Sequence, residues 1–335
     1  MYPRSMARLI QALTLAAAPA TAALGQWTAI HMHPGGNYES SIFAVTATVQ
    51  GGEYLRTPVP PGPFHVNALL WSGSPSSWTS LAPAAPLSNS AVLGIDGSTQ
   101  VGTYIGAALW HGTPESRIDL APPGVGSSSA RAVRNNMQVG AFSTLGPNSV
   151  PHASLWRGTP ESFIDLHPSW ASASQGYATD GVLQGGAIYL GAPGTQGNAH
   201  AALWNGTPES VIDLNPPGMT SEIFGMAPGL QVGMAKGIGN MRAAVWNGSV
   251  ESYVNFHPPG DPGASWFTAT TGSIHVGRWT YGPGGFGRAA INFGTPKSWL
   301  GLHDLLPPTS PPSPWPPPST RTETPSTSAA TPSTT

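Results

Sequence analysis

The sequence contains no cysteine, which excludes disulfides, thiolate metal sites and a cysteine nucleophile. Charged side chains are also scarce, at 8% of the 335 residues, and no basic run or patch is present. Because binding to a phosphate backbone needs clustered Lys and Arg, this composition argues against nucleic acid as a partner. The His-Glu-x-x-His, Gly-x-Ser-x-Gly and phosphate-loop patterns are missing too, so the recognisable enzyme signatures are absent.

Helical periodicity is equally rare once the N-terminus is set aside. The chain instead holds 42 glycines and 37 prolines, which supply turn residues in quantity. Such a composition is typical of many short strands joined by tight turns, and it predicts an all-β fold.

Residues 1–25 predict a signal peptide. Arg4 and Arg8 precede an uncharged stretch, Leu9–Ala18, and small residues suited to cleavage follow. A membrane anchor is the alternative, but the stretch is short, and no other segment is long enough to span a bilayer. We therefore expect an extracellular or cell-surface protein whose mature chain begins near Gln26, with 11 basic against 15 acidic side chains.

One sequence frame returns six times along the chain. An Ala-Ala-aliphatic-Trp strand is followed by a turn such as Asn205-Gly206-Thr207-Pro208-Glu209 and a returning strand, Ser210–Leu214. A second hairpin then ends in a Gln-Val-Gly segment. Successive copies begin 39 to 48 residues apart, a spacing typical of propellers and stacked repeats. The copies of the first strand lie at 68–71, 107–110, 153–156, 201–204, 243–246 and 289–292.

Two hairpins per copy predict four strands, and six copies predict a six-bladed β-propeller over residues 26–306. An open β-solenoid is the structural alternative, because the period alone does not establish closure. For a closed ring, we expect residues 41–56 and residues 288–302 to pair and complete the sixth blade from both ends. Residues 27–34 imitate a returning strand and either add an outer strand or compete with residues 299–303 for one position.

Residues 307–335 are rich in Pro, Ser and Thr and lack the aliphatic residues that a core requires. This composition predicts a disordered tail.

The repeats resemble the HAF family of bacterial extracellular repeat proteins. The resemblance rests on His200-Ala201-Ala202-Leu203-Trp204, on Ile212-Asp213-Leu214 and on Leu230-Gln231-Val232-Gly233. Ala202 stands where that family favours Phe, and proline follows the Asp-Leu segment in place of a glycine-rich run. The resemblance implies a secreted or surface β-propeller-like protein and carries over no catalytic residue.

Aromatic side chains give the first group of candidate ligand-binding residues. The recurring Trp at the end of each anchor strand is expected to fill the wedge between blades, although a row of sugar-stacking platforms is the alternative. A second aromatic position, in the returning strand, alternates with Arg117 and Val211 and is expected to be partly exposed. We take its aromatic occupants as ligand-binding candidates: Trp78, Phe163, Tyr253 and Trp299.

Acidic and basic side chains recur at fixed positions as well. Asp119, Asp165 and Asp213 share one position, where an Asp is expected to bind the backbone of the next turn. If these carboxylates instead lined a central channel, they would be candidate catalytic residues of a carbohydrate-active hydrolase or lyase, whose paired carboxylates lie about 5 to 9.5 Å apart. Further ligand-binding candidates precede the anchor strand: His152, His200, Arg242 and Arg288.

These observations predict a secreted, non-catalytic, monomeric repeat protein that acts as a binding or scaffolding module for a protein or glycan. No metal site and no cofactor is predicted, because histidines on separate blades could converge only at a narrow channel mouth.

Overall fold

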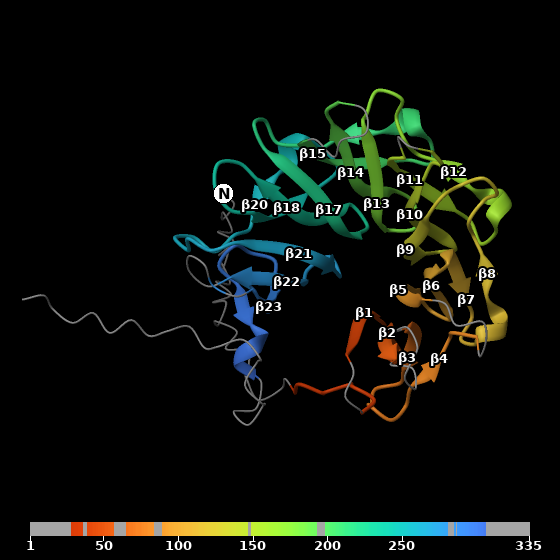
Figure 1. The fold of residues 1–335 in the computed structure, drawn as a ribbon. Coiled ribbons are helices and arrows are strands. Elements are labelled where there is room, and N and C mark those ends of the chain that lie inside the picture. Colours follow the sequence, from red (N-terminus) through yellow and green to blue (C-terminus); the bar gives the residue numbers. More distant parts are fainter. Residues whose placement is uncertain are drawn as a thin grey trace, which may run out of the picture.

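The structure, a computed structural model, describes residues 28–35, 39–56, 65–83, 89–146, 149–192, 198–280, 285 and 287–305. These residues form six four-stranded antiparallel sheets arranged around one axis as a six-bladed β-propeller (Figure 1). The predicted fold class is thereby confirmed. The signal peptide at 1–25 and the tail at 307–335 lie outside the described residues and stay predictions.

Each blade is built from four strands that are consecutive in the sequence. Blade 1 contains β1 (Ser40–Val45), β2 (Gln50–Arg56), β3 (His65–Trp71) and β4 (Thr79–Ser80). Blade 2 contains β5 (Ser90–Asp96), β6 (Thr99–Tyr104), β7 (Gly106–Trp110) and β8 (Ile118–Asp119). Blade 3 contains β9 (Ser128–Arg134), β10 (Met137–Ser143), β11 (Pro151–Trp156) and β12 (Ile164–Asp165).

The other three blades follow the same order. Blade 4 contains β13 (Ala173–Thr179), β14 (Gln184–Leu190), β15 (Asn198–Trp204) and β16 (Ile212–Asp213). Blade 5 contains β17 (Thr220–Ala227), β18 (Leu230–Lys236), β19 (Arg242–Trp246) and β20 (Val254–Asn255). Blade 6 contains β21 (Ser265–Thr270), β22 (His275–Thr280), β23 (Gly287–Asn292) and β24 (Trp299–Gly301).

Short 3₁₀ helices precede or follow the fourth strands. They are η2 (Pro114–Ser116), η3 (Pro160–Ser162), η4 (Pro208–Ser210), η5 (Val250–Ser252) and η6 (Leu302–Leu305). The returning strand is therefore shorter than expected. In blade 4, for example, Ser210 belongs to η4, and pairing is confined to Ile212–Asp213.

The expectation that the two ends of the chain share a blade was wrong. Residues 41–56 form β1 and β2, which pair with β3 inside blade 1, whereas β23 and β24 pair with β22 inside blade 6. The sequence repeat is half a unit out of phase with the blade. Prolines explain the boundary: segments such as Pro216-Pro217 follow the fourth strand, and a residue without an N–H cannot extend a strand ladder.

The first strand of every blade faces the axis. In Figure 1 the strands β1, β5, β9, β13, β17 and β21 surround the centre, and consecutive members of this series lie in contact. The fourth strands lie at the outer rim, farthest from the axis.

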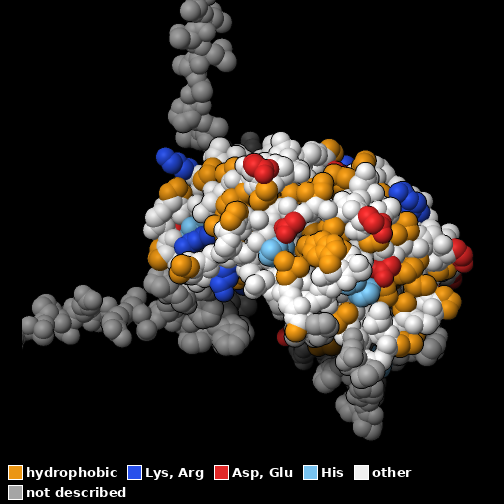
Figure 2. Space-filling view, turned by 90° about the horizontal axis from the view of Figure 1, so that it is seen from above, with side chains coloured by type: hydrophobic (Ala, Val, Ile, Leu, Met, Phe, Trp, Pro, Cys, Tyr) orange, Lys and Arg blue, Asp and Glu red, His pale blue; other side chains and the backbone are white. Residues whose placement is uncertain are grey.

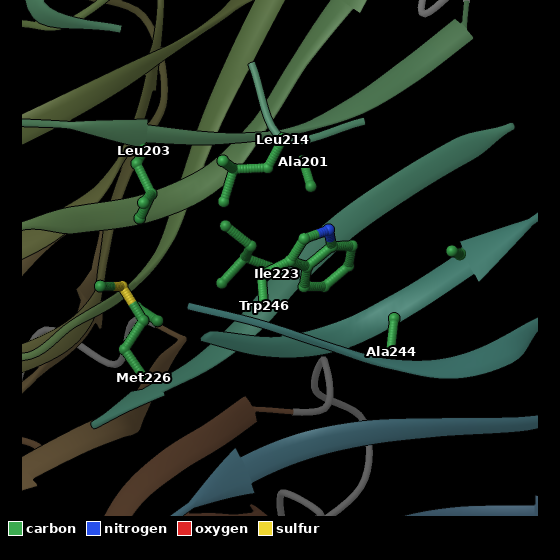
Figure 3. Packing of buried hydrophobic residues seen from close by; sticks show 9 residues of the cluster. Ala201, Leu203, Leu214, Ile223, Met226, Ala244 and Trp246 are labelled. Atoms are coloured by element: carbon green, nitrogen blue, oxygen red, sulfur yellow. The ribbon is translucent and has the colours of Figure 1, made fainter. Parts of the chain in front are cut away.

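The recurring tryptophans are core residues, as expected: Trp71, Trp110, Trp156, Trp204 and Trp246 are at most 1% exposed. Figure 3 shows Trp246 packed among Ala201, Leu203 and Leu214 of the preceding blade. None of the five indole N–H groups has a hydrogen-bond partner among the described residues. Burying a ring of this size contributes about 4–6 kcal/mol, which outweighs the roughly 1–3 kcal/mol cost of the unmet N–H.

Each residue of the Gln-Val-Gly segment has a distinct structural role. The Gln lies opposite the Trp, as Gln184 does opposite Trp204, and its Oε1 accepts the N–H of the turn glycine, Gly206, at 2.8 Å. That glycine has φ +81°, as its recurrence in the turn predicted. The Val packs between blades, and Val101, Val139 and Val232 are fully buried.

The Gly of the segment is required by a β-bulge in the first strand. A Cβ at Gly186 would collide with the carbonyl of Gln175, which lies on the neighbouring strand β13. The register shifts at that point, between Gly176 and Ala178, so Tyr177 has no partner on β14. The corresponding glycines of the other five blades meet the same obstacle: Gly52, Gly102, Gly140, Gly233 and Gly277.

Candidate ligand site at the propeller axis

The six bulges place six side chains in one row around the axis. Each innermost strand has one residue that the pairing skips, and a bulge turns such a residue out of the regular alternation. The skipped residues are Phe43, Leu93, Arg131, Tyr177, Phe224 and Thr268. The row is apolar in blades 1 and 2, whereas blades 3 to 5 contribute a guanidinium, a phenol and a phenyl ring.

A chain of hydrogen bonds crosses blades 3, 4 and 5 at this level. Arg131 Nη1 donates to Oε1 of Gln175 at 2.8 Å, and Gln175 Nε2 lies 3.4 Å from the hydroxyl of Tyr189. The Tyr189 hydroxyl donates to Oε1 of Glu222 at 3.1 Å and lies 3.2 Å from the hydroxyl of Tyr177. Because the Tyr189 proton goes to Glu222, Tyr177 is the donor of the bond between the two phenols.

Aromatic contacts fix the same side chains. The Arg131 guanidinium lies 4.8 Å from the centre of the Tyr177 ring, and Tyr177 meets Phe224 edge-on at 5.5 Å. The axial site, defined here as Arg131, Gln175, Tyr177, Tyr189, Glu222 and Phe224, therefore joins three blades through polar and aromatic contacts.

Burial dominates the electrostatics of the axial site. It raises the pKa of Glu222, and the Tyr189 hydroxyl and the Arg131 charge oppose this shift only in part. It also raises the pKa of Tyr177 and of Tyr189. Both phenols consequently remain hydrogen-bond donors at neutral pH. A positive charge stands at one end of the network and a carboxyl group at the other.

A cavity adjoins the axial site between blades 3 and 4. Its volume is about 220 Å³, and Arg131 and Gln175 form part of its wall together with Phe142 and several serines. Ser127, Ser128, Ser129 and Ser143 all line it. A space with a guanidinium, an amide and hydroxyl groups is suited to a small ligand that forms several hydrogen bonds.

The sequence-predicted carboxylates do not line the channel. Asp119, Asp165 and Asp213 end the fourth strands β8, β12 and β16, on the outer rim. Two of them bind the backbone of the next turn, as expected, whereas Asp119 accepts the Nε–H of Arg117 at 2.9 Å. Asp165 Oδ1 accepts the N–H of His167 at 2.8 Å, and Asp213 Oδ1 accepts that of Asn215 at 2.8 Å. The idea of a hydrolase with these residues as channel carboxylates is thereby corrected.

Two of the candidate histidines pair with these aspartates instead of converging on one point. His152 Nδ1 lies 2.9 Å from Asp165 Oδ2, and His200 Nδ1 lies 2.7 Å from Asp213 Oδ2. Figure 2, which looks onto the rim, shows acidic and histidine side chains scattered over this face. In the part of the chain that the structure describes, no group of three or more His, Asp or Glu side chains could hold a metal ion.

The candidate arginines differ in their surroundings. Arg242 Nη1 lies 2.5 Å from Nε2 of His257 and donates to the carbonyl of Gly263 at 2.6 Å, so it ties β19 to the next blade. Arg288 is exposed on β23.

The His167 side chain contacts both His152 and Ser174. Its ring stacks on that of His152, with ring centres 3.8 Å apart, and its Nδ1 lies 3.0 Å from the hydroxyl of Ser174. Ser174 is fully buried, and its hydroxyl already accepts the N–H of Ala153. This Ser-His contact therefore holds two blades together and presents no nucleophile to solvent.

The aromatic candidates also divide. Trp78 is 48% exposed and remains an accessible surface ring. Phe163 and Tyr253 pack beside the core tryptophans Trp156 and Trp246, at 5.8 Å in both cases. Trp299 stacks on Phe267 at 5.0 Å. Three of the four candidates thus contribute to packing.

A second cavity, of about 610 Å³, lies between blades 4 and 5, and His200 lines it with Asn215 and Lys236. His200 is therefore the sequence-predicted candidate that meets a described cavity. We take the axial site as the better candidate than this cavity, because its hydrogen bonds and aromatic contacts join three blades.

Sequence reasoning missed the axial residues, although a pattern marks them. Each innermost strand follows the frame Ser-x-x-X-Gly/Ala, as in Ser174-Gln175-Gly176-Tyr177-Ala178. The residue X varies widely, is followed by Gly or Ala in all six blades, and is the bulged one. No helix among the described residues is long and apolar enough to cross a membrane.

Comparison with known proteins adds the fold and nothing finer. No protein-family model and no curated protein matches the chain. Among solved structures, it is similar to an acylaminoacyl peptidase of Pyrococcus horikoshii, with a TM-score of 0.53 and 9% identity over 77% of this chain and 45% of that one.

Two further matches are more distant. They are the β-propeller domain of the Trilobed protease from Pyrococcus furiosus (TM-score 0.42, 8% identity, 79% of this chain and 95% of that one) and TolB from Acinetobacter baumannii (0.43, 10%, 76% and 62%). The chain spans less than half of the acylaminoacyl peptidase. At such identities the likeness shows a β-propeller fold alone.

Proposed function

We propose that this chain is an exported binding module that holds one end of an oligosaccharide at the axial site. The observation that carries the proposal is the network from Arg131 to Glu222, which spans three blades beside a cavity lined by serines. Ligand sites combine a few fixed polar groups with apolar and aromatic walls, and the axial site has both.

Sugar chemistry fits this arrangement better than an apolar ligand would. A pyranose offers hydroxyl groups that donate and accept at once, and the site presents an amide, two phenols, a guanidinium and a carboxyl group. Tyr177 and Phe224 add aromatic surface for the C–H face of a sugar ring. Both rings are held by contacts with their neighbours, since Tyr177 packs between Arg131 and Phe224.

Binding without turnover is the expected activity. Hydrolysis of a glycosidic bond generally uses two carboxyl groups about 5 to 9.5 Å apart, and the axial network contains the single carboxyl of Glu222. The predicted signal peptide agrees with a role at the cell surface, where polysaccharides are accessible.

The test is calorimetric binding of the mature protein to a panel of neutral and acidic oligosaccharides. Replacing Arg131 by Gln or Tyr177 by Ala should weaken the binding of a positive ligand at least tenfold, since hydrogen bonds to charged groups contribute about 1.5–3 kcal/mol. Arg134→Gln is the matched control, because Arg134 lies exposed at the end of the same strand.

Three results would overturn the proposal. Binding that survives both axial substitutions would place the ligand elsewhere, and binding of proteins but no sugar would reject the ligand class. Turnover of an oligosaccharide that Glu222→Gln abolishes would replace the binding module with an enzyme.

A further inference from the structure

The same type of hydrogen bond occurs at five of the contacts between neighbouring blades, which are called joints below. The serine that opens each innermost strand accepts the backbone N–H of an alanine, or its equivalent, in the third strand of the preceding blade. The pairs are Ser90 with Ala68, Ser128 with Ala107, Ser174 with Ala153, Ser221 with Ala201 and Ser265 with Ala243, at 2.9 to 3.0 Å. All five serines are buried.

The sixth joint, between blade 6 and blade 1, is not formed. Ser40 opens β1, yet among the described residues no backbone N–H of blade 6 reaches its hydroxyl. Val276 of blade 6 is 37% exposed, although its counterpart Val232 is fully buried. Ile42 of blade 1 is 41% exposed, whereas its counterparts Val92 and Ile223 are fully buried. Figure 1 shows the two blades standing apart.

Residues 28–34 match the sequence frame of a preceding blade's fourth strand, although they are not paired into a sheet. In blades 3 and 5 a histidine after the fourth strand binds the serine of the next blade, as His167 binds Ser174 at 3.0 Å and His257 binds Ser265 at 2.8 Å. His33 Nδ1 binds the hydroxyl of Ser40 in the same way, at 2.9 Å.

A second correspondence supports this placement. Met32 stands in the frame position of Leu166 and Leu214, which pack on the tryptophan of the next blade, and Trp71 of blade 1 is fully buried. Blade 6 already has its own fourth strand, β24. Residues 28–33 therefore belong to neither blade 6 nor blade 1.

We propose that the opening between blades 6 and 1 accommodates a seventh blade whose fourth strand is residues 28–33. The three inner strands are not among the described residues, and residues 306–335 contain neither a Gln-x-Gly segment nor an Ala-Ala-x-Trp strand, so we assign these strands to a partner. The partner is a three-stranded antiparallel β-element. Such an element would pair with Ile30, offer an N–H to Ser40 and cover Val276 and Ile42.

The facing surfaces of blades 6 and 1 determine which chemistry the partner must have. Both of its faces must be apolar, because each meets the exposed aliphatic side chains of a blade. A small hydroxyl residue at the start of its first strand would receive the N–H of Ala289, the counterpart of Ala243. Strand addition of this kind satisfies the backbone of Ile30 and closes the ring.

Whether the opening accommodates a blade can be tested with a copy of one of the chain's own blades. Inserting a duplicate of residues 220–253 between Ala29 and Ile30 of the full chain supplies three inner strands and a turn in frame. If the opening fits a blade, the midpoint of thermal unfolding should rise by about 5 °C or more, because two new joints form. Val276→Arg should abolish that rise in the extended chain. An extended chain that folds and melts no higher than the wild type would overturn the proposal.

Disulfide trapping gives an answer that does not depend on the insertion folding. The wild-type chain has no cysteine, so introduced pairs report without background. Ala68→Cys with Ser90→Cys marks a formed joint and should oxidise to a disulfide. Ser40→Cys with Ala289→Cys marks the open joint and should remain reduced. If the second pair oxidises as completely as the first, the ring closes directly on itself and leaves no room for a seventh blade.

Discussion

Blade 6 differs from blade 5 at the pair formed by a residue at the start of the second strand and the last residue of the third strand. In blade 5, Gln231 lies opposite Trp246, and the Gln holds the turn glycine Gly248 at 2.8 Å. In blade 6, His275 lies opposite Asn292, and Asn292 Oδ1 takes over the turn by accepting the N–H of Gly294 at 2.9 Å.

The aromatic residue that packs between blades also comes from a different strand in blade 6. Trp299, from the fourth strand, stacks on Phe267 and donates its indole N–H to the carbonyl of Phe256 at 2.8 Å. The comparison shows that the fold requires an acceptor for the turn and a filler for the wedge between blades. Either requirement can be met from more than one strand.

The largest expected effect comes from removing the wedge residue in each blade. Trp246→Ala should destabilise the protein by about 3–5 kcal/mol, because a fully buried indole leaves a large cavity. If Trp299 fills the same role, Trp299→Ala should also cost about 2–3 kcal/mol, less because its ring is partly exposed. Urea unfolding measures both.

The control is Trp78→Ala at the same frame position in blade 1, where the ring is 48% exposed and a change within about 0.5 kcal/mol is expected. A loss for Trp299→Ala as small as that of the control would break the comparison between blades.

A smaller effect distinguishes a closed joint from the open one. Val232→Ala removes two methyl groups from a fully buried position and should cost about 2 kcal/mol. Val276→Ala makes the same chemical change on the uncovered face of blade 6 and should cost less than about 0.5 kcal/mol. Equal losses in urea unfolding would indicate that blade 6 is covered in solution.

The smallest effect concerns the residue that follows the fourth strand. Burial, with a further contribution from His152, lowers the pKa of His167 from its ordinary 6.5 to about 4, although Asp165 opposes the shift. Between these values the unfolded chain binds the proton and the folded chain does not, so stability falls as the pH drops from 6.5 towards 4.

Blade 4 offers the matched substitution for this effect. Asn215 occupies the position of His167 and accepts the Ser221 hydroxyl at 2.6 Å, without a titrating group. His167→Asn should keep the contact with Ser174 and reduce the loss of melting temperature between pH 7 and pH 5. Identical losses in the variant and the wild type would show that His167 does not titrate in this range.

Much of the architecture could be predicted from the sequence. The spacing of the anchor strands and the small residues of the turns were sufficient for six four-stranded blades, and the repeated Trp indicated the core. The phase of the blade could not be read in the same way. A repeated sequence does not show where one structural unit ends and the next begins. Only strand pairing shows that Gln50–Arg56 belongs to the same blade as His65–Trp71.

The candidate site was harder to predict because repetition gave the wrong signal. Asp165 and Asp213 recur because both accept a backbone N–H of the turn after the fourth strand, so their repetition reflects structure. The axial side chains carry no such repetition: Arg131, Tyr177 and Phe224 occupy one position with three unrelated chemistries. Their proximity depends on bulges, which arise from pairing and leave only a faint mark in the sequence.

The bulges separate the demands of folding from the choice of ligand. At most positions of an innermost strand a side chain is confined by the blades on either side, but the skipped residue lies outside the ladder and faces the axis. A mutation there leaves the joints and the turn contacts untouched. New axial surfaces can therefore evolve, or be selected in a library of variants at six positions, on an unchanged frame, with Arg131, Tyr177 and Phe224 varied together because they contact one another.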